Sequence, residues 1–227
     1  ESLVIMARGE EEALAARAAI RLSTQEIYRQ ENIEEILDES IQIVKQKKIE
    51  PSEQLKKDWL SYFFDKCKDV SDSDVQKFWG AILAGEFEKN NSFSRMTLSV
   101  LQSMNSADVQ LFKKYCAYVF HIDGRLMRLK ISAHNKELAK DDIREEEILH
   151  LQDIGLLQEP KEYHFNKGST VVVEYGKTRF TATFRTHRQQ KAEYLTRAGQ
   201  ELYHLANAED SKHYNEILVS RFQIMSK

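Results

Sequence analysis

Glu86 has the most distinctive setting of any carboxylate in the sequence, because it follows the small pair Ala84-Gly85 inside an otherwise apolar helical pattern. General acid–base catalysis would require a second titratable or phosphate-binding group beside it. No partner carboxylate, histidine or phosphate-binding loop accompanies it. The structural alternative is that Glu86 pairs with Arg95 or accepts backbone N–H groups from the turn at residues 92–94. We favour the structural role.

The histidines and cysteines are candidate metal ligands or nucleophiles, but their spacing fits neither role. Cys67 and Cys116 stand apart without a CxxC pair, which favours a reducing compartment and therefore the cytoplasm. Phosphate-loop, dinucleotide-binding, GxSxG and HExxH motifs are also lacking. We therefore predict a protein that is not an enzyme, with no cofactor and no metal site. The scattered histidines are His121, His134, His150, His164, His187, His204 and His213.

Basic residues on strand-like runs could contact nucleic-acid phosphates, and the candidates are Lys177, Arg179, Arg185 and Arg188. A basic strand edge is also typical of a solvated surface that resists aggregation. The net charge of −3 supplies no general attraction to nucleic acid or to an anionic membrane. The acidic stretch at 141–154 would be repelled by a duplex. We expect a solvated edge, and nucleic-acid contact is the alternative.

Helices must position most of these groups. Residues 1–48 contain no proline and one glycine, and they predict one long helix or two helices separated near Gly9. Short loops farther along predict a compact helical domain over 49–120. Start signals for its helices are Pro51, a capping box formed by Ser71 and Asp74, Ser94, and Asn105 or Ser106.

The pattern changes after residue 120. Alternating residues around Asp123-Gly124 predict a small hairpin or an edge strand. A helix is expected from Asp141 or Asp142 to Gly155, followed by strands and a helix at 195–202. This order resembles a winged-helix domain over about residues 142–205. The expected fold is thus mainly α with a small β part: a long helix (1–48), a helical bundle (49–120) and a winged-helix-like α+β domain (121–227).

The first helix could mediate self-association. Small residues at 13–19 suit close helix contact, but an exposed, solvated helix is the alternative. Because the chain begins with Glu1 and not Met, we expect that the natural N-terminus is missing, and with it any membrane-binding segment. The apolar stripe of this helix drifts without forming clean heptads; its members are Ile20, Ile27, Ile33, Ile36, Ile41 and Val44.

A family resemblance rests on the central residues Trp79, Gly85 and Glu86, followed by Ser92-Phe93-Ser94 and Thr97-Leu98. Together with similar stretches upstream and downstream, this signature resembles a bacterial family of uncharacterised proteins that is defined only as a domain of unknown function. The resemblance covers about residues 26–203. Asn90-Asn91 stand where the family commonly has Pro-Gly, which leaves the turn type open. The resemblance implies a fold and brings no activity.

These observations predict a non-enzymatic bacterial cytoplasmic protein that forms a homo-oligomer and binds a protein partner of unknown identity. A role in phage defence is a hypothesis suggested only by the bacterial type of the family. The alternative function is a nucleic-acid-binding regulator that uses the basic wing.

Overall fold

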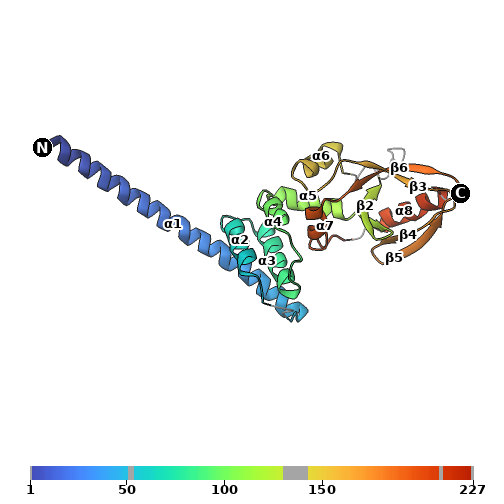
Figure 1. Cartoon of the computed structure of the whole chain (residues 1–227), viewed down its shortest axis with the longest axis horizontal. Helices are drawn as coiled ribbons and strands as arrows, with labels where there is room; N and C mark the ends of the chain where they lie inside the picture. Colours follow the sequence, from blue (N-terminus) through green and yellow to red (C-terminus); the bar gives the residue numbers. More distant parts are fainter. Residues whose placement is uncertain (1, 51–53, 130–142, 210–211, 226–227) are drawn as a thin grey trace. The chain divides into compact units, whose positions relative to one another are not determined.

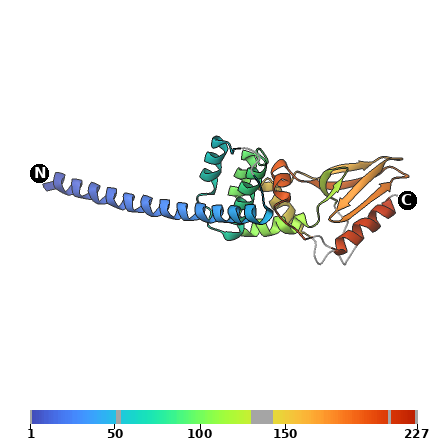
Figure 2. The same cartoon turned by 90° about the horizontal axis from the view of Figure 1, so that it is seen from below.

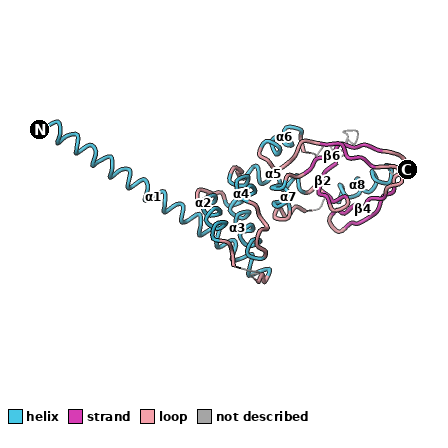
Figure 3. Tube along the Cα trace, viewed as in Figure 1, coloured by secondary structure: helices cyan, strands magenta, loops and turns pink. Residues whose placement is uncertain are grey.

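The computed structural model describes residues 2–50, 54–129, 143–209 and 212–225. The chain divides into two compact units, residues 1–91 (unit 1) and residues 92–227 (unit 2). The described part of unit 1 is helical, whereas the strands all lie in unit 2, as the magenta segments of Figure 3 show. The predicted division at 48 and 120 stays a prediction.

The described residues of unit 1 form three helices: α1 (Ser2–Lys47), α2 (Lys57–Cys67) and α3 (Ser73–Glu88). The prediction of a long first helix is confirmed, and α1 continues through Gly9 without a break. Figure 1 shows that the N-terminal half of α1 extends past α2 and α3. Pro51, the predicted start of the second helix, lies outside the described residues.

Aromatic residues fill the core of unit 1. Trp59 and Phe63 lie one turn apart on α2, and their rings stack with centroids 5.2 Å apart. The Phe63 ring also meets Trp79 of α3 edge to face at 5.2 Å. Ile36 of α1 is fully buried, as are Phe63 and Trp79. This arrangement gives Trp59 and Trp79 the packing role that their helical spacing indicates.

Gly80 sets the distance between α1 and α3. A Cβ atom at this position would lie 2.6 Å from the Cβ of Glu39 and 3.1 Å from the backbone nitrogen of Ser40. Any larger residue would therefore push the two helices apart, since real Cβ atoms do not approach their neighbours so closely. Glycine is required here for close approach, and α1 is held against α3 along this contact.

The start of α3 differs from the expected capping box. Asp72, and not Ser71, is the N-cap, and its Oδ1 accepts hydrogen bonds from the backbone nitrogens of Asp74 (3.0 Å) and Val75 (3.2 Å). A carboxylate at this position satisfies two free N–H groups and also interacts favourably with the helix dipole. Both reasons favour Asp72 over the neighbouring hydroxyl.

Unit 2 combines helices with a six-stranded antiparallel sheet of order β3-β6-β2-β1-β4-β5. The predicted hairpin is confirmed: β1 and β2 join through Asp123 and Gly124, whose φ values of 49° and 77° fit a tight turn. The helices are α4 (Arg95–Gln102), α5 (Ser106–Cys116), α6 (Glu145–Asp153), α7 (Arg197–Tyr203) and α8 (Lys212–Met225), and the strands are β1 (Phe120–Ile122), β2 (Arg125–Leu129), β3 (Lys161–Phe165), β4 (Thr170–Tyr175), β5 (Thr178–Thr183) and β6 (Arg188–Tyr194).

The sheet is larger than the small β part expected from the sequence, so the fold is mixed α and β. The expected wing does not form one continuous hairpin. Strand β3 pairs with β6, whereas β4 pairs with β1 and β5 on the other side of the sheet. The turn at residues 166–168 therefore connects two strands that are not neighbours. Strand pairing depends on distant segments, which local patterns do not reveal.

Helix α8 covers one face of the sheet, as Figure 2 shows. Its Tyr214, Leu218 and Phe222 are buried in the main apolar cluster of unit 2, which includes Phe120 and Phe165 from the strands. Because side chains alternate along a strand, the residues between these core positions point to the opposite face. That second face carries the polar groups considered below.

Helix α6 confirms part of the predicted helix before the wing. Ile148 and Leu151 are buried, and Gly155 follows the end of the helix. The first helical residue is Glu145, and the Glu147 carboxylate accepts a hydrogen bond from the backbone nitrogen of Arg144. Asp141 and Asp142, the predicted start, lie outside the described residues.

Candidate functional site

Glu86 lies in the last turn of α3, where its side chain stabilises the fold. Its side chain is buried, and Oε1 accepts a hydrogen bond of 2.6 Å from the backbone nitrogen of Asn91. The preceding carbonyl of Gly85 accepts the N–H of Lys89 at the helix C-cap. The Asn91 N–H that donates this hydrogen bond lies one residue before the turn at residues 92–94. Glu86 therefore stabilises the exit from α3.

The Ser-Phe-Ser part of the signature begins unit 2. Phe93 is buried, and Ser94 is the N-cap of α4, where its Oγ accepts the backbone N–H of Thr97. The backbone nitrogen of Ser94 donates to Oε2 of Glu201 over 2.7 Å, and the Thr97 hydroxyl donates to the same oxygen. Ser92 directly precedes this arrangement. The signature thus describes a helix start that is held by a carboxylate from α7.

Glu201 is a residue that sequence reasoning missed. Burial raises the pKa of its carboxyl, but hydrogen bonds from the Ser94 N–H, the Thr97 hydroxyl and Arg197 outweigh burial, so the pKa lies below its ordinary value. The Glu201 charge stabilises the start of α4 and holds α7 against it. The only sequence signal was its place in the Leu-Thr-x-x-Gly-x-x-Leu segment.

The four basic residues proposed to contact nucleic acid are all exposed, but the sheet does not bring them together. Lys177 and Arg179 lie at the start of β5, whereas Arg185 and Arg188 follow its end. At the rise of an extended strand, Arg179 and Arg185 are roughly 20 Å apart along the chain. Arg179 also pairs with Glu174 at 3.2 Å, which reduces its free charge. These residues form no single phosphate-binding patch.

One face of α1 packs against the rest of unit 1. Ile36 is fully buried, and Asn32 donates from Nδ2 to the backbone carbonyl of Lys68 over 2.9 Å. Arg29 donates from Nε to Oδ1 of Asp69 over 2.8 Å. These α1 residues are spaced by three and four positions, so they occupy one side of the helix.

The same face of α1 continues toward the N-terminus without cover. Leu14, Ala18 and Leu22 follow the spacing of the packed residues, yet Leu14 is 60% exposed and Leu22 is 51% exposed. On the opposite side, Ile20 (68% exposed) and Ile27 (56% exposed) lie seven residues apart. The exposed apolar residues of α1 therefore lie on two opposite faces of the helix, and not on the single drifting stripe expected from the sequence.

Both faces are unusual for a helix in water. Exposed apolar side chains that occur singly are normal on protein surfaces, but a contiguous group of large ones marks an interaction surface. We call Ala13, Ile20 and Ile27 the isoleucine face, and Leu14, Ala18 and Leu22 the leucine face. These two faces of α1 are the candidate functional site of unit 1.

Comparison with families of known sequence places residues 16–219 in the family described as Protein of unknown function (DUF2806). The chain belongs to this family. The match covers most of the 227 residues, including all the signature residues and both isoleucines of the isoleucine face. Comparison with curated proteins and with solved structures found no match. The family description therefore brings no activity to this DUF2806 chain.

The sheet of this DUF2806 chain carries a buried ion pair on its second face. Arg128 Nη1 and Glu193 Oε2 are 2.8 Å apart, and both side chains are almost fully buried. The hydroxyl of Tyr115 also donates to Glu193, and the Arg128 guanidinium lies over the rings of Tyr115 and Tyr118. Burial raises the pKa of the Tyr115 phenol, so this group stays protonated. The cluster is internal and is closed to a substrate.

The two cysteines of the DUF2806 chain are free and buried. Burial raises the pKa of the Cys67 thiol to about 12 and also raises the pKa of Cys116. A thiol reacts as its thiolate, so neither cysteine is prepared to act as a nucleophile at neutral pH.

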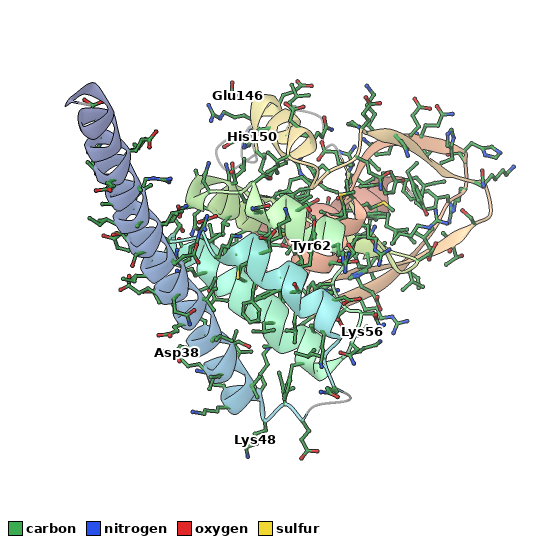
Figure 4. All side chains as sticks on the ribbon, turned by 60° about the vertical axis from the view of Figure 1, so that its left-hand side comes forward. Asp38, Lys48, Lys56, Tyr62, Glu146 and His150 are labelled. Carbon is green, nitrogen blue, oxygen red and sulfur yellow. The ribbon has the colours of Figure 1, made fainter. Side chains whose placement is uncertain are left out.

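An acidic hollow of about 410 Å³ lies between α1 and the start of α3. It is lined by Glu35, Asp38 and Glu39 of α1, and Figure 4 labels Asp38 on that helix. The Gln76 amide donates to Glu35 over 2.7 Å, so this carboxylate already has a hydrogen-bond partner within the fold. Among the residues that the structure describes, no group of three or more His, Cys, Asp or Glu side chains could hold a metal ion.

The helices that the structure describes include none with the length and apolar character that a membrane span requires.

Proposed function

We propose that this DUF2806 chain is a non-enzymatic bacterial protein of the cytoplasm that self-associates through α1 and serves as a protein-interaction module. The observation that carries the proposal is the uncovered isoleucine face, in which Ile20 and Ile27 are more than half exposed on a helix. Two free, buried cysteines support a reducing compartment.

A second copy of α1 is the partner that this face fits best. Ala13, Ile20 and Ile27 are separated by seven residues each, which is the repeat of the central position of a coiled coil. Ala16 lies three residues after Ala13, at the second central position, and its small side chain lets two helices approach closely. Glu34 occupies the next repeat, so the apolar row ends there. The contact is expected to be short.

The charges beside the isoleucine face favour a parallel pair. Glu12 and Arg17 occupy the flanking positions that meet across two parallel helices, so each Glu12 would face the partner's Arg17. Glu26 and Glu31 would face each other in the next repeat. Glu26 already pairs with Arg29 of its own helix at 2.5 Å, which reduces that repulsion.

The energy of this contact is modest. Burial of one isoleucine side chain contributes about 1.5–3 kcal/mol. Association costs an estimated 4–15 kcal/mol in lost freedom. Two isoleucines from each copy, with the flanking alanines, therefore support a reversible oligomer and not a permanent one.

Light scattering of the chain at micromolar concentration tests the proposal. The expected result is a concentration-dependent oligomer that becomes a monomer in the double variant Ile20→Glu/Ile27→Glu, with unchanged helix content. Tyr28→Glu is the matched control, because Tyr28 is 62% exposed and lies on a different side of α1. A strict monomer for the unaltered chain would overturn the proposal.

We also propose that unit 2 is a variant of the winged-helix fold. Supporting features are α6, the pairing of β3 with β6 directly after it, and the contact of α7 with α4. The β1–β2 and β4–β5 hairpins would then be additions to that fold. An experimental structure of unit 2 compared with winged-helix domains tests this assignment.

The nucleic-acid alternative receives no support from the arrangement of its residues. Lys177 and Arg179 are separated from Arg185 and Arg188 by the length of β5, and Arg179 is paired with Glu174. If duplex DNA at low salt bound the chain and binding weakened on replacement of these arginines, the alternative would replace our proposal.

A further inference from the structure

Strand β5 (Thr178–Thr183) forms one edge of the six-stranded sheet. Its partner within the sheet is β4, and the sheet ends at the other side of β5 (Figure 1). Natural proteins usually protect such an edge, because the unpaired backbone groups of an extended strand can bind a further strand. An edge that lacks this protection is a candidate site for a strand from a partner.

The hydrogen bonds of β4 show which backbone groups of β5 point outward. Both backbone groups of Val172 bond to Asp123: its nitrogen donates to Oδ1 over 2.9 Å, and its carbonyl accepts the Asp123 N–H over 3.0 Å. Thr181, the residue opposite Val172 in β5, therefore does not bond to it. Because bonded and non-bonded pairs alternate in an antiparallel ladder, Arg179, Thr181 and Thr183 direct their N–H and C=O groups away from β4. Within the described part of the chain, no residue bonds to these outward groups.

The two edges of the sheet differ in how they are protected. Strand β3 carries the exposed side chains of Lys161, Glu162 and His164, and charged residues on an edge oppose pairing with another strand. Residues 180–183 of β5 carry no charge, and the threonines among them favour extended structure. Arg179, which precedes them, is already paired with a carboxylate at 3.2 Å. Strand β5 is thus the edge that is more open to a partner.

The surroundings of β5 are basic. Residues 175–192 contain five lysines and arginines and no aspartate or glutamate. Lys177 and Arg185 lie just beyond the two ends of the strand, both are exposed, and neither forms a salt bridge with the residues that the structure describes. They are eight positions apart in the sequence, which is roughly 26 Å in an extended chain. This spacing fits an extended segment that carries acidic residues near both of its ends.

An added strand would also cover apolar surface. Phe180 is only partly buried, and its ring packs against Phe222 of α8 with centroids 5.7 Å apart. A side chain of the added strand would lie directly beside Phe180, because residues of neighbouring strands pair across a sheet. The exposed Thr181 on the second face would meet a polar side chain in the same way. The edge therefore favours a segment in which apolar and polar residues alternate.

We propose that the free edge of β5 binds an extended acidic segment of a partner protein, which adds one strand to the sheet. The inference rests on the proposed role as a protein-interaction module, and it names the surface and the kind of partner. Main-chain hydrogen bonds to Arg179, Thr181 and Thr183 would hold the segment. Carboxylates near its ends would pair with Lys177 and Arg185.

Charge argues for this occupant and against a second copy of β5. In the antiparallel register that pairs Thr181 with Thr181 of another copy, Lys177 would lie opposite Arg185 of that copy. Like charges directly opposite each other destabilise paired strands. An acidic segment replaces both repulsions with attractions.

Isothermal titration calorimetry of the full chain at low salt tests the proposal with synthetic peptides. The probe is a peptide of about nine residues, long enough to span the edge, in which valine and threonine alternate and aspartate stands at each end. It should bind, and a version with asparagine ends should bind about fivefold more weakly. A version with lysine ends should bind more weakly still. Added salt should reduce these differences, because exposed charges are screened.

N-methylation of the aspartate-ended peptide tests the strand geometry. Only every second N–H of an added strand meets β5. Methyl groups on one alternate set of residues should therefore abolish binding, whereas methyl groups on the other set should leave most of it. Equal effects of the two sets would overturn the proposal.

Variants of the chain test the same contacts from the other side. Thr181→Pro removes one outward N–H and should weaken binding about tenfold. Thr181→Ala is its matched control, because it keeps that N–H, and it should bind nearly as well as the unaltered chain. Lys177→Gln/Arg185→Gln should weaken the aspartate-ended peptide and not the asparagine-ended one. Lys161→Gln, on the other edge of the sheet, should change neither, and thermal melting should show that all these variants remain folded.

Light scattering of the same samples separates this proposal from self-association through α1. Ile20→Glu/Ile27→Glu should remove the oligomer and leave peptide binding unchanged, whereas Thr181→Pro should do the reverse. Loss of the oligomer in Thr181→Pro would overturn the proposal and assign the edge to a second copy. Tighter binding of a duplex DNA oligonucleotide than of the acidic peptide would overturn it in favour of nucleic acid. No binding of the aspartate-ended peptide at low salt would also overturn it.

Discussion

The two halves of α1 differ in composition and in surroundings, since the alanines of residues 10–47 all lie before residue 20. From Arg29 to Lys47 one side of the helix is buried by α2 and α3, with Ile36 fully buried. From Glu10 to Tyr28 the side chains of Leu14, Leu22 and Ile27 are more than half exposed. A helix forms along the whole length in both cases.

The difference teaches that helix propensity and burial are separate determinants here. Residues 10–28 are rich in alanine, glutamate and arginine, which favour a helix without tertiary contacts. Residues 29–47 remain in place because Gly80 lets α3 approach their backbone. The helical structure of residues 10–28 thus depends on the helix propensity of the residues themselves, whereas the position of residues 29–47 depends on packing against α3.

The largest expected effect comes from Gly80→Val, which would place a branched side chain against Glu39 and Ser40. Overpacking at this contact should lower the free energy of unfolding by about 3 kcal/mol. Urea denaturation followed by circular dichroism measures it. Ala19→Val, in the exposed half of α1, is the control, and it should cost well under 1 kcal/mol. Equal losses would show that Gly80 does not determine the packing.

The next effect comes from shortening one isoleucine in each half. Ile36→Ala should lower the free energy of unfolding by about 2–5 kcal/mol, because it leaves a cavity at a fully buried position. Ile27→Ala should change it by less than about 0.5 kcal/mol in the monomer while weakening self-association. Denaturation at low protein concentration separates the two quantities. A large loss for Ile27→Ala in the monomer would mean that this side chain is already buried.

Sequence reasoning succeeded where the signal was local. The long helix, the aromatic stripe of α2 and the turn at Asp123-Gly124 follow from nearby residues, and the structure contains all three. The stripe of α1 was harder to interpret. Ile20 and Ile36 have the same residue type, and only the position of α3 decides that one is buried and the other exposed.

The sheet and its contacts between distant segments could not be predicted in the same way. Pairing of β3 with β6 joins segments with two other strands between them, and nothing in either segment specifies the partner. His121 and His204 were seen as scattered histidines because 83 positions separate them in the sequence. The fold brings both to one pocket. Glu201 was missed for the same reason.

A smaller effect is expected from Asn32→Ala in the packed half of α1. The Asn32 amide donates to the carbonyl of Lys68, and its removal leaves that partly buried carbonyl without this donor. The loss in free energy of unfolding should be about 1 kcal/mol. Gln30→Ala is the control, since the Gln30 amide donates a hydrogen bond to Glu34 on the exposed side of α1. If both variants lost the same stability, the Asn32 contact would have no special role.

The smallest effect concerns Arg29, which lies where the packed half begins. Its Nε is 2.8 Å from Asp69 and its Nη1 is 2.5 Å from Glu26, and these hydrogen bonds raise the pKa of the guanidinium. The pairs are solvent-accessible, so the attraction is screened by salt and its contribution to stability is small. Arg29→Gln should lower the unfolding midpoint slightly at low salt and not at high salt. Measuring the unfolding midpoint at both salt concentrations distinguishes this charge effect from lost packing. A loss that persists at high salt would mean that the aliphatic part of the Arg29 side chain packs against unit 1 where the packed half of α1 begins.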